Sequence, residues 1–504
     1  MMVATRIPPW ADRAGRWVLF TAALWWVLRP SLAVSITYDD FFNPVRVREL
    51  YGANPFSIVS GAIRDLNANG HFNYIGTSLG GLYYVAWDQL AAAGIRLTTS
   101  YALTKLVAFI VAIVAAARLL RVLLELLGRS WSVWRARITV AVLLIATMQL
   151  HVAWSFDPVA SFPLWGYLSV GVGFGAMIVA IPALAGTSNR SPWWATLALC
   201  LSIQYYEINV AVVAALVPVG VLLLRRSTGE GRRDILRRAK VLLVPPAAMT
   251  VVLALWARHA NEGYEGTQTG LSSGGLGNLG RSFVSSFPMS SWPQARDFLD
   301  TSPPLTVWLV IAAVIVGTTT LVLAGRPSEP QPPVAWIDAA LVAASMLTVW
   351  LAATLIQGAT VKVNVQSWGL GNVYMYYAYG SLALPLAAVL LLQAWPGAAW
   401  WRQWWQRWLR PAALAGTIVF AFVQLSLNDG VQRHFDARYP AFDTVLDAYA
   451  DQPPEPERCA ALAEWKAMRD WSIYYPSFPR SLDVVYHEHH GVPFCSEPGT
   501  QDAP

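Results

Sequence analysis

The sequence is poor in charge. Of its 504 residues only 13% are charged, whereas 55% are hydrophobic, and the mean hydropathy is +0.42. Soluble domains carry about 25% charged residues. A chain with so little charge cannot cover a water-facing surface, which excludes an ordinary soluble enzyme and a disordered protein. The composition predicts a polytopic membrane protein.

Cysteine and lysine are also scarce. Three cysteines exclude a disulfide-dense secreted scaffold, although Cys459 and Cys495 could pair in an oxidising compartment. Only four of the 36 basic residues are lysine, and the Arg-, Ala- and Trp-rich composition fits a GC-rich bacterial genome. The basic residues form no groove interleaved with aromatics, so we expect no nucleic-acid partner. A lipid bilayer is the expected surrounding.

Apolar stretches of about 20 residues mark the candidate membrane spans. They are 17–36, 99–117, 138–155, 163–184, 206–224, 241–257, 303–325, 335–357, 374–395 and 411–427. A further apolar stretch, 192–204, is shorter than the rest. The Gly- and Ser-rich stretch 266–280 lies between two spans and is predicted to be a flexible external loop.

Arginine clusters predict the orientation of these spans, because cytoplasmic loops carry the excess of basic residues. The clusters are Arg6–Arg16, Arg118–Arg137, Arg225–Lys240 and Arg402–Arg410. All four are cytoplasmic, with the N-terminus inside, only if 192–224 crosses the membrane twice. We therefore predict a break at residues 204–207, with a short first limb that lines a cavity. The total is about eleven spans.

This topology describes an all-α protein of the bacterial inner membrane with a cytoplasmic N-terminus and an extracytoplasmic C-terminus. Residues 1–427 form the predicted transmembrane domain, which includes a large first external loop at 37–98. Residues 428–504 form a small extracytoplasmic domain. Within the loop, 45–66 is predicted to be an amphipathic surface helix and 77–94 an interfacial or re-entrant helix.

The first external loop opens with an acidic pair, Asp39 and Asp40. Two adjacent carboxylates at the membrane boundary are costly to bury, which points to a function. One could take a proton from a sugar hydroxyl while the other orients it, or both could hold a divalent cation. The alternative is a solvated loop start that caps the following helix.

The order of these features resembles a known family. An acidic pair beyond the first span is followed by two juxtamembrane helices, then by Gly94-Ile-Arg-Leu-Thr-Thr-Ser-Tyr-Ala-Leu-Thr-Lys105 and a span that ends in Ala-Arg118-Leu-Leu. Over residues 15–225 this layout is similar to that of the GT-C membrane glycosyltransferases, which include protein O-mannosyltransferases and lipid A aminoarabinose transferases. The resemblance implies a sugar on a polyprenyl phosphate as donor. It also implies a first-loop acid, Asp39 or Asp40, as catalytic base.

The predicted reaction is therefore an inverting sugar transfer to a glycan, lipid-linked or protein acceptor on the outer side. The sequence contains no P-loop, Gly-x-Gly-x-x-Gly fingerprint or Gly-x-Ser-x-Gly elbow in a suitable setting. A lipid-linked donor needs no nucleotide site, which agrees with that absence. No cofactor is required by any motif, and a divalent cation, Mg²⁺ or Mn²⁺, is the one that the acidic residues suggest.

Other polar residues are candidates for substrate binding. They are Arg29, His71, Tyr206, Glu207, Arg258, His259 and Tyr376. Arg29 lies in the outer half of the first span and could bind a lipid phosphate or simply snorkel to the interface. Glu207, at the predicted break, could orient an acceptor or share a cation with Asp40. It could also be a structural carboxylate.

The remaining candidates lie near external span ends. His71 belongs to a turn within the first loop. Arg258 and His259 could hold a donor phosphate, or could be an ordinary solvated loop start. Tyr376 belongs to an aromatic cluster that could stack on a sugar or form an interfacial belt. His151 and Asp157 are more simply an interfacial pair.

Three other classes of function remain open. One is a structural scaffold whose external domain binds cell-wall polymer. A polymerase or ligase that uses lipid diphosphate donors would depend on arginine rather than on an acid. A lipid or glycan transporter is less favoured, because the polar residues gather at span ends and not at the bilayer midplane.

Overall fold

The computed structural model describes most of the chain. The described residues are 9–33, 51–52, 54–93, 95–151, 159, 161–260, 268, 273–288, 290–295, 334–360, 375–394, 410–438, 454–467, 483, 486–487 and 490–496. The acidic pair Asp39 and Asp40 and the expected span 303–325 lie outside these residues.

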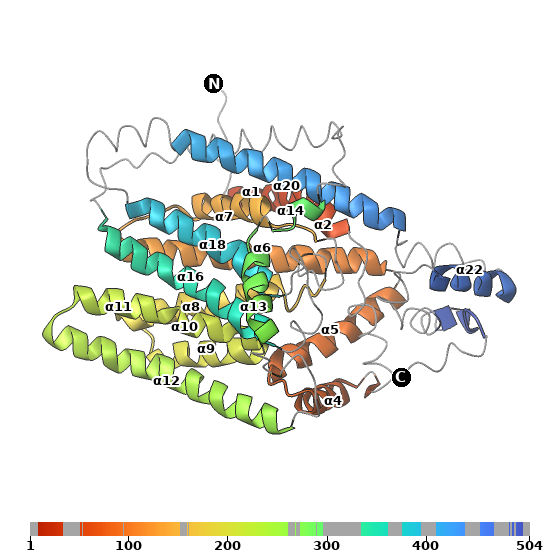
Figure 1. Ribbon diagram of the computed structural model, residues 1–504, viewed down its shortest axis with the longest axis horizontal. Coiled ribbons are helices and arrows are strands. Elements are labelled where there is room, and N and C mark those ends of the chain that lie inside the picture. Colours follow the sequence, from red (N-terminus) through yellow and green to blue (C-terminus); the bar gives the residue numbers. More distant parts are fainter. Residues whose placement is uncertain are drawn as a thin grey trace.

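Every regular element in the described ranges is a helix (Figure 1). The helices are α1 (Pro9–Val27), α2 (Arg29–Ala33), α4 (Pro55–Ala68), α5 (Tyr74–Ala92), α6 (Leu97–Leu126), α7 (Val133–Thr147), α8 (Tyr167–Ala185), α9 (Pro192–Tyr205), η2 (Glu207–Asn209), α10 (Val210–Ala214), α11 (Leu216–Arg226), α12 (Gly229–Ala260), α13 (Ser273–Ser285), α14 (Trp292–Ala295), α16 (Trp336–Gly358), α18 (Tyr376–Leu391), η4 (Leu392–Ala394), α20 (Arg410–Arg438) and α22 (Glu455–Ala467). The predicted all-α class is confirmed for this part of the chain.

Five of the described helices are long and apolar enough to cross a membrane. They are Thr98–Leu126, Tyr167–Ala185, Glu207–Arg226, Gly229–Trp256 and Trp336–Gly358. A sixth apolar helix, Tyr376–Leu391, is shorter. These helices indicate a membrane protein, and the count of about eleven spans stays a prediction.

The long helices run side by side along the longest axis of the molecule (Figure 1). Within this bundle α6 packs against α7 and α8, α9 packs against α8 and α12, and α16 packs against α18, α10 and α11. The helices α4, α5 and α22 lie toward one end of the bundle (Figure 1). The predicted surface helices of the first loop are thus helical over 55–68 and 74–92.

Contacts between helix ends show that α11 and α16 run in opposite directions and that α6 ends at the same end of the bundle as α11. At one end, called here the basic end, the Arg226 guanidinium at the end of α11 pairs with Asp338 in the first turn of α16 at 2.6 Å. The same guanidinium donates to the carbonyl of Leu126, where α6 ends. At the other end of the bundle, Gln357 near the end of α16 donates to the hydroxyl of Tyr206.

The predicted break within 192–224 is confirmed. Helix α9 ends at Tyr205, Tyr206 is extended (φ −157°, ψ 127°), and η2 begins at Glu207. The buried amide of Asn209 stabilises the break by donating to the carbonyl of Ser202 at 2.9 Å and accepting from the hydroxyl of Tyr379 at 2.9 Å. The chain therefore reverses direction at this point, between α9 and α10.

Two predicted boundaries are wrong. Helix α7 ends at Thr147 rather than near 155, because the following backbone is taken up by tertiary bonds: Asn428 binds the carbonyl of Met148 and the N–H of Leu150. Helix α20 continues to Arg438, beyond the predicted span end at residue 427. The division into domains at 427/428 stays a prediction.

The stretch 266–280 also differs from its prediction, because from Ser273 onward it forms helix α13. Glycine and serine weaken a helix in isolation. Here Leu279 and Ser282 pack so closely on Gly358 of α16 that a Cβ there would lie 3.0 Å from both. Tertiary packing therefore overrides the local preference.

A disulfide joins the C-terminal segments. Cys459 of α22 is bonded to Cys495, as the sequence allowed. The buried Arg458 reinforces the link by donating to the carbonyls of Pro493 at 3.0 Å and Phe494 at 2.8 Å.

We expect the pair at the basic end to matter for stability. Asp338 is only 15% exposed and bonds to Arg226, so Asp338→Ala should lower the free energy of unfolding by about 1–3 kcal/mol. The control is Asp234→Ala, because the Asp234–Arg237 pair is 49% and 75% exposed and should contribute less than about 1 kcal/mol. Thermal unfolding in detergent measures both. Equal losses in the two variants would contradict the assigned role.

Candidate functional site

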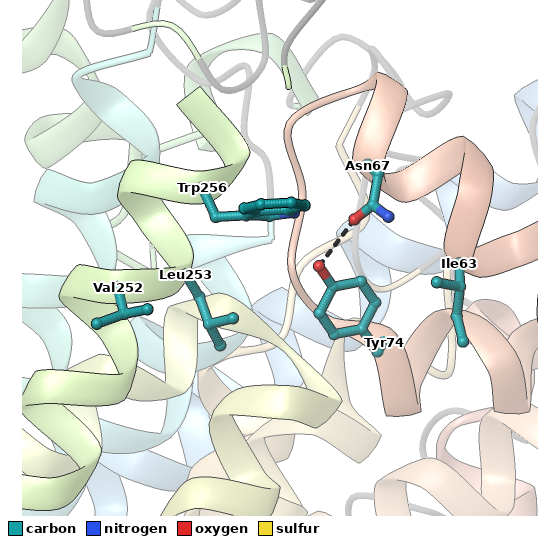
Figure 2. Close-up of a pocket in the computed structure, with 6 residues that line it drawn as sticks. All are labelled: Ile63, Asn67, Tyr74, Val252, Leu253 and Trp256. Atoms are coloured by element: carbon teal, nitrogen blue, oxygen red, sulfur yellow. Dashed lines mark hydrogen bonds between the residues drawn. The ribbon is translucent and has the colours of Figure 1, made fainter. Parts of the chain in front are cut away.

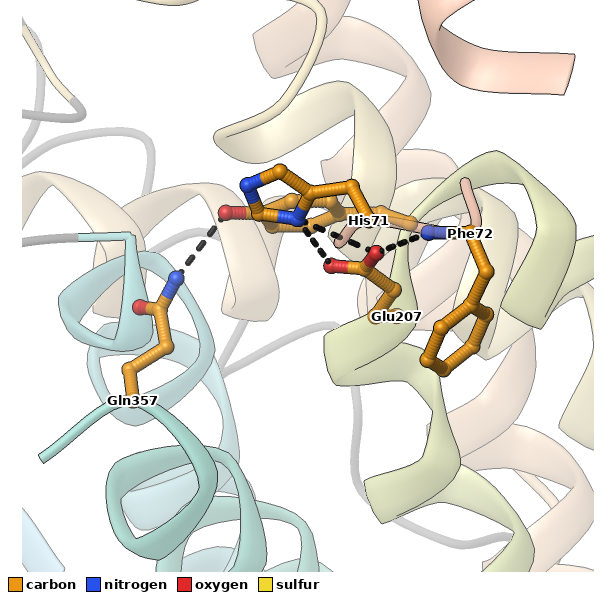
Figure 3. A network of polar contacts seen from close by, with 5 residues as sticks. His71, Phe72, Glu207 and Gln357 are labelled. Carbon is orange, nitrogen blue, oxygen red and sulfur yellow. Dashed lines mark hydrogen bonds and ion pairs between the residues drawn. The ribbon is translucent and has the colours of Figure 1, made fainter. Parts of the chain in front are cut away.

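A carboxylate that is only 17% exposed, that of Glu207, organises the end of the bundle opposite the basic end. Both carboxylate oxygens of Glu207 lie 3.1 Å from Nδ1 of His71, and one accepts from the N–H of Phe72 at 2.6 Å (Figure 3). The N–H of Asn73 also donates to this carboxylate. The turn between α4 and α5 thus closes around the start of η2.

A second set of hydrogen bonds begins at Tyr206, the residue before Glu207. The hydroxyl of Tyr206 accepts from Nε2 of Gln357 at 2.9 Å, and Oε1 of Gln357 accepts from the N–H of Tyr376 at 2.9 Å. The hydroxyl of Tyr376 is hydrogen-bonded to Ser282 of α13. We call the two connected sets of bonds the Glu207 network. It brings together four of the predicted substrate-binding residues: His71, Tyr206, Glu207 and Tyr376.

Two glycines make this local arrangement feasible. Gly70 has a φ of 69°, a left-handed conformation that turns the chain sharply after α4. Gly76, in the first turn of α5, lies so close to the carbonyl of Tyr205 that a Cβ would overlap with its oxygen. The backbone N–H groups of Phe72 and Asn73, just before α5, donate to the carboxylate, as is favourable near a helix N-terminus.

An apolar groove adjoins the network. It has a volume of about 590 Å³ and is lined by Ile63, Asn67, Tyr74, Val252, Leu253 and Trp256 (Figure 2). We call it the α4–α12 groove. Its polar side is formed by the hydroxyl of Tyr74, which donates to Oδ1 of Asn67 at 2.8 Å. Burial, and then the nearby Glu207 carboxylate, raise the pKa of Tyr74, so the groove and the carboxylate are electrostatic neighbours.

The predicted cationic residues lie outside the Glu207 network. Arg258 and His259 are exposed in the last turn of α12, just beyond Trp256 of the α4–α12 groove. Arg29 is exposed at the start of α2. The geometry leaves the two arginines and the histidine accessible to an anionic group without bringing them together.

Two further residues help to hold neighbouring helices together and were not predicted as site residues. Gln357 joins Tyr206 to Tyr376, and nothing in the sequence sets it apart. Lys105 did leave a signal, since it is one of four lysines and lies in an apolar stretch. It is 1% exposed, and its Nζ donates to the carbonyl of Ser31 in α2 at 2.9 Å and lies 4.7 Å from the ring centroid of Tyr101. A buried ammonium at membrane depth is a functional indication.

The metal prediction is not tested, because Asp40 lies outside the described residues. Within the described part of the chain, no three His, Cys, Asp or Glu side chains gather as a metal-binding group would require.

Comparison with protein-family models, with curated proteins and with solved structures finds no match to this chain. The relation to GT-C glycosyltransferases therefore stays a prediction from the order of sequence features. The function has to be argued from the Glu207 network and the α4–α12 groove.

The contact at Gly76 generates a test of the site's architecture. Gly76→Ala should force α5 away from α9, and overpacking of this kind costs about 1–3 kcal/mol. Gly175→Ala in α8 is the matched control, because a Cβ there meets nothing within 4 Å and alanine favours a helix by up to about 1 kcal/mol. Thermal unfolding compares the two. A Gly76→Ala protein as stable as the Gly175→Ala protein would show that the close approach is not required.

Proposed function

We propose that this protein is a membrane glycosyltransferase of the GT-C type. It transfers a sugar from a polyprenyl-phosphate donor to a glycan, lipid-linked or protein acceptor on the outer side of the bacterial inner membrane. One observation carries the proposal: a buried polar network at the helix ends directly adjoins an apolar groove. A polar head on a lipid tail is the substrate chemistry that fits both.

The opposite directions of α11 and α16 support the proposed topology of about eleven spans. The Arg225–Lys240 cluster lies at the basic end with the ends of α6 and α11, which is the expected cytoplasmic side. The Cys459–Cys495 disulfide agrees with an extracytoplasmic C-terminus, since such bonds persist in oxidising compartments.

The α4–α12 groove suits the lipid-linked end of the donor. Val252 and Leu253 offer aliphatic contacts for an isoprenoid chain, and the indole of Trp256, 56% exposed, offers a flat apolar face. Arg258 and His259, just beyond Trp256, are placed to attract the donor phosphate.

The proposed reaction is a single displacement. Asp39 or Asp40 takes the proton from the acceptor hydroxyl, whose oxygen bonds to the anomeric carbon. The bond from that carbon to the phosphate oxygen breaks, and polyprenyl phosphate leaves with the electron pair. Inversion follows because attack and departure occur on opposite faces of the sugar.

Glu207 is a positioning residue in this scheme. Its carboxylate accepts from His71, Phe72 and Asn73, so its lone pairs are engaged within the protein. This arrangement favours the structural alternative over direct orientation of an acceptor. Because phosphate is already a good leaving group, the protein has to align the substrates more than it has to supply acid catalysis.

The acidic pair gives the decisive experiment. Purified protein in detergent, supplied with glycan, lipid-linked and protein acceptors, should transfer sugar and release polyprenyl phosphate from at least one member of a panel of polyprenyl-phosphate sugars. Asp39→Asn or Asp40→Asn should reduce that rate by about 100-fold or more, the usual contribution of a general base. Asp234→Asn, at the exposed Asp234–Arg237 pair, is the control and should retain activity.

Two results would count against the proposal. If both asparagine variants keep full activity, the acidic pair is structural and the proposed base is wrong. If the wild-type protein releases nothing from any donor, the transferase proposal fails and the polymerase and transporter alternatives gain.

The groove is tested by substrate length. Trp256→Ala should raise KM roughly tenfold, equivalent to about 1.4 kcal/mol, for a long-chain donor and leave KM for a short-chain donor unchanged. Trp194→Ala is the control, because Trp194 is similarly exposed (62%) but belongs to α9, outside the groove. An equal effect on both donor lengths would show that Trp256 does not contact the lipid chain.

A further inference from the structure

A second polar cluster lies on the other side of the start of α18. It consists of Gln149, His151, Gln424 and Asn428, all of them 0–1% exposed, and we call it the amide cluster. The first two residues belong to the segment that leaves α7, and the last two to α20. Uncharged polar groups buried this deeply are unfavourable unless they are hydrogen-bonded.

Two members of the amide cluster have a clear structural role. Asn428 accepts from the N–H of Leu150 at 2.8 Å and donates to the carbonyl of Met148 at 3.0 Å. Gln424 donates to Asn428 at 3.2 Å and accepts from the indole N–H of Trp292 at 2.9 Å. Together they hold residues 148–150 against α20.

Gln149 is different, because its amide oxygen and nitrogen are both buried and neither has a hydrogen-bond partner among the residues that the structure describes. The backbone on each side of Gln149 is held by Asn428, so the side chain cannot easily turn toward solvent. An unsatisfied buried amide requires an explanation, and a ligand that completes its bonds is one.

The amide cluster is a neighbour of the Glu207 network. The ring of His151 meets the ring of Tyr377 edge-on, with centroids 4.5 Å apart. Tyr377 follows Tyr376, whose N–H is bound by Gln357 of the Glu207 network. Both polar groups thus contact the first turn of α18, one through Tyr376 and the other through Tyr377.

We propose that Gln149, beside His151 and Tyr377, binds the acceptor sugar, an inference that rests on the proposed function. An amide offers one acceptor and two donors in a plane, which matches adjacent sugar hydroxyls. The described members of the amide cluster carry no carboxylate, lysine or arginine, so an uncharged ligand suits it better than a phosphate does. Because Gln149 has no exposed surface, the sugar reaches it only when neighbouring side chains move.

Gln149→Met separates a binding role from a structural one, since methionine keeps the shape and removes the amide. We expect KM for the acceptor to rise at least tenfold, with KM for the donor unchanged and the unfolding temperature equal or higher. Gln424→Met is the matched control, because it removes an amide whose oxygen and nitrogen are both hydrogen-bonded and should lower the unfolding temperature.

A binding measurement tests the inference without transferase activity. Free hexoses, pentoses and short oligosaccharides are added to the wild-type protein, and at least one should raise its unfolding temperature but not that of Gln149→Met. If no sugar does so, or if the variant responds like the wild type, the inference is overturned. It is also overturned if Gln149→Met destabilises the protein as Gln424→Met does. Absence of transfer by a wild type that still binds sugar would overturn the proposed function alone.

Discussion

The hydrogen bonds between the Glu207 carboxylate and the turn 71–73 determine how α4 and α5 meet the bundle of long helices. The break after Tyr205 places Glu207 at the start of η2, where the turn supplies His71 and two backbone N–H groups. Through these bonds α4 and α5 are held beside α12, and the α4–α12 groove forms between them. The proposed lipid path therefore depends on a carboxylate that need not touch the substrate.

The helical class and the break at Glu207 could be predicted because both follow from hydropathy and charge along the chain. The predicted topology was required to place all four arginine clusters on the cytoplasmic side. Only a reversal of the chain at 204–207 met that requirement. The end of α7 could not be predicted in this way, because it depends on Asn428, 280 residues away from Met148. Helix α13 likewise depends on its contact with Gly358.

The site was partly predictable for the same reason. Four site residues could be singled out because each is polar and lies next to the end of an apolar stretch: His71, Tyr206, Glu207 and Tyr376. What joins them is Gln357, an ordinary residue at the end of α16 whose role appears only when α16 packs beside η2. Gln149 is a similar case, because nothing in the sequence indicates that its buried amide has no partner among the described residues.

The Glu207 network and the amide cluster both contact the first turn of α18. Successive residues of a helix point about 100° apart, and Tyr376 and Tyr377 use this to face different neighbours. Tyr376 joins Gln357 and Ser282, whereas Tyr377 donates to the carbonyl of Thr147 and contacts His151. With a donor beside the Glu207 network and an acceptor at Gln149, both substrates would be positioned against one rigid, fully buried helix start. Their relative placement would then follow from the backbone of α18 rather than from a mobile loop, which is the alignment that a single displacement requires.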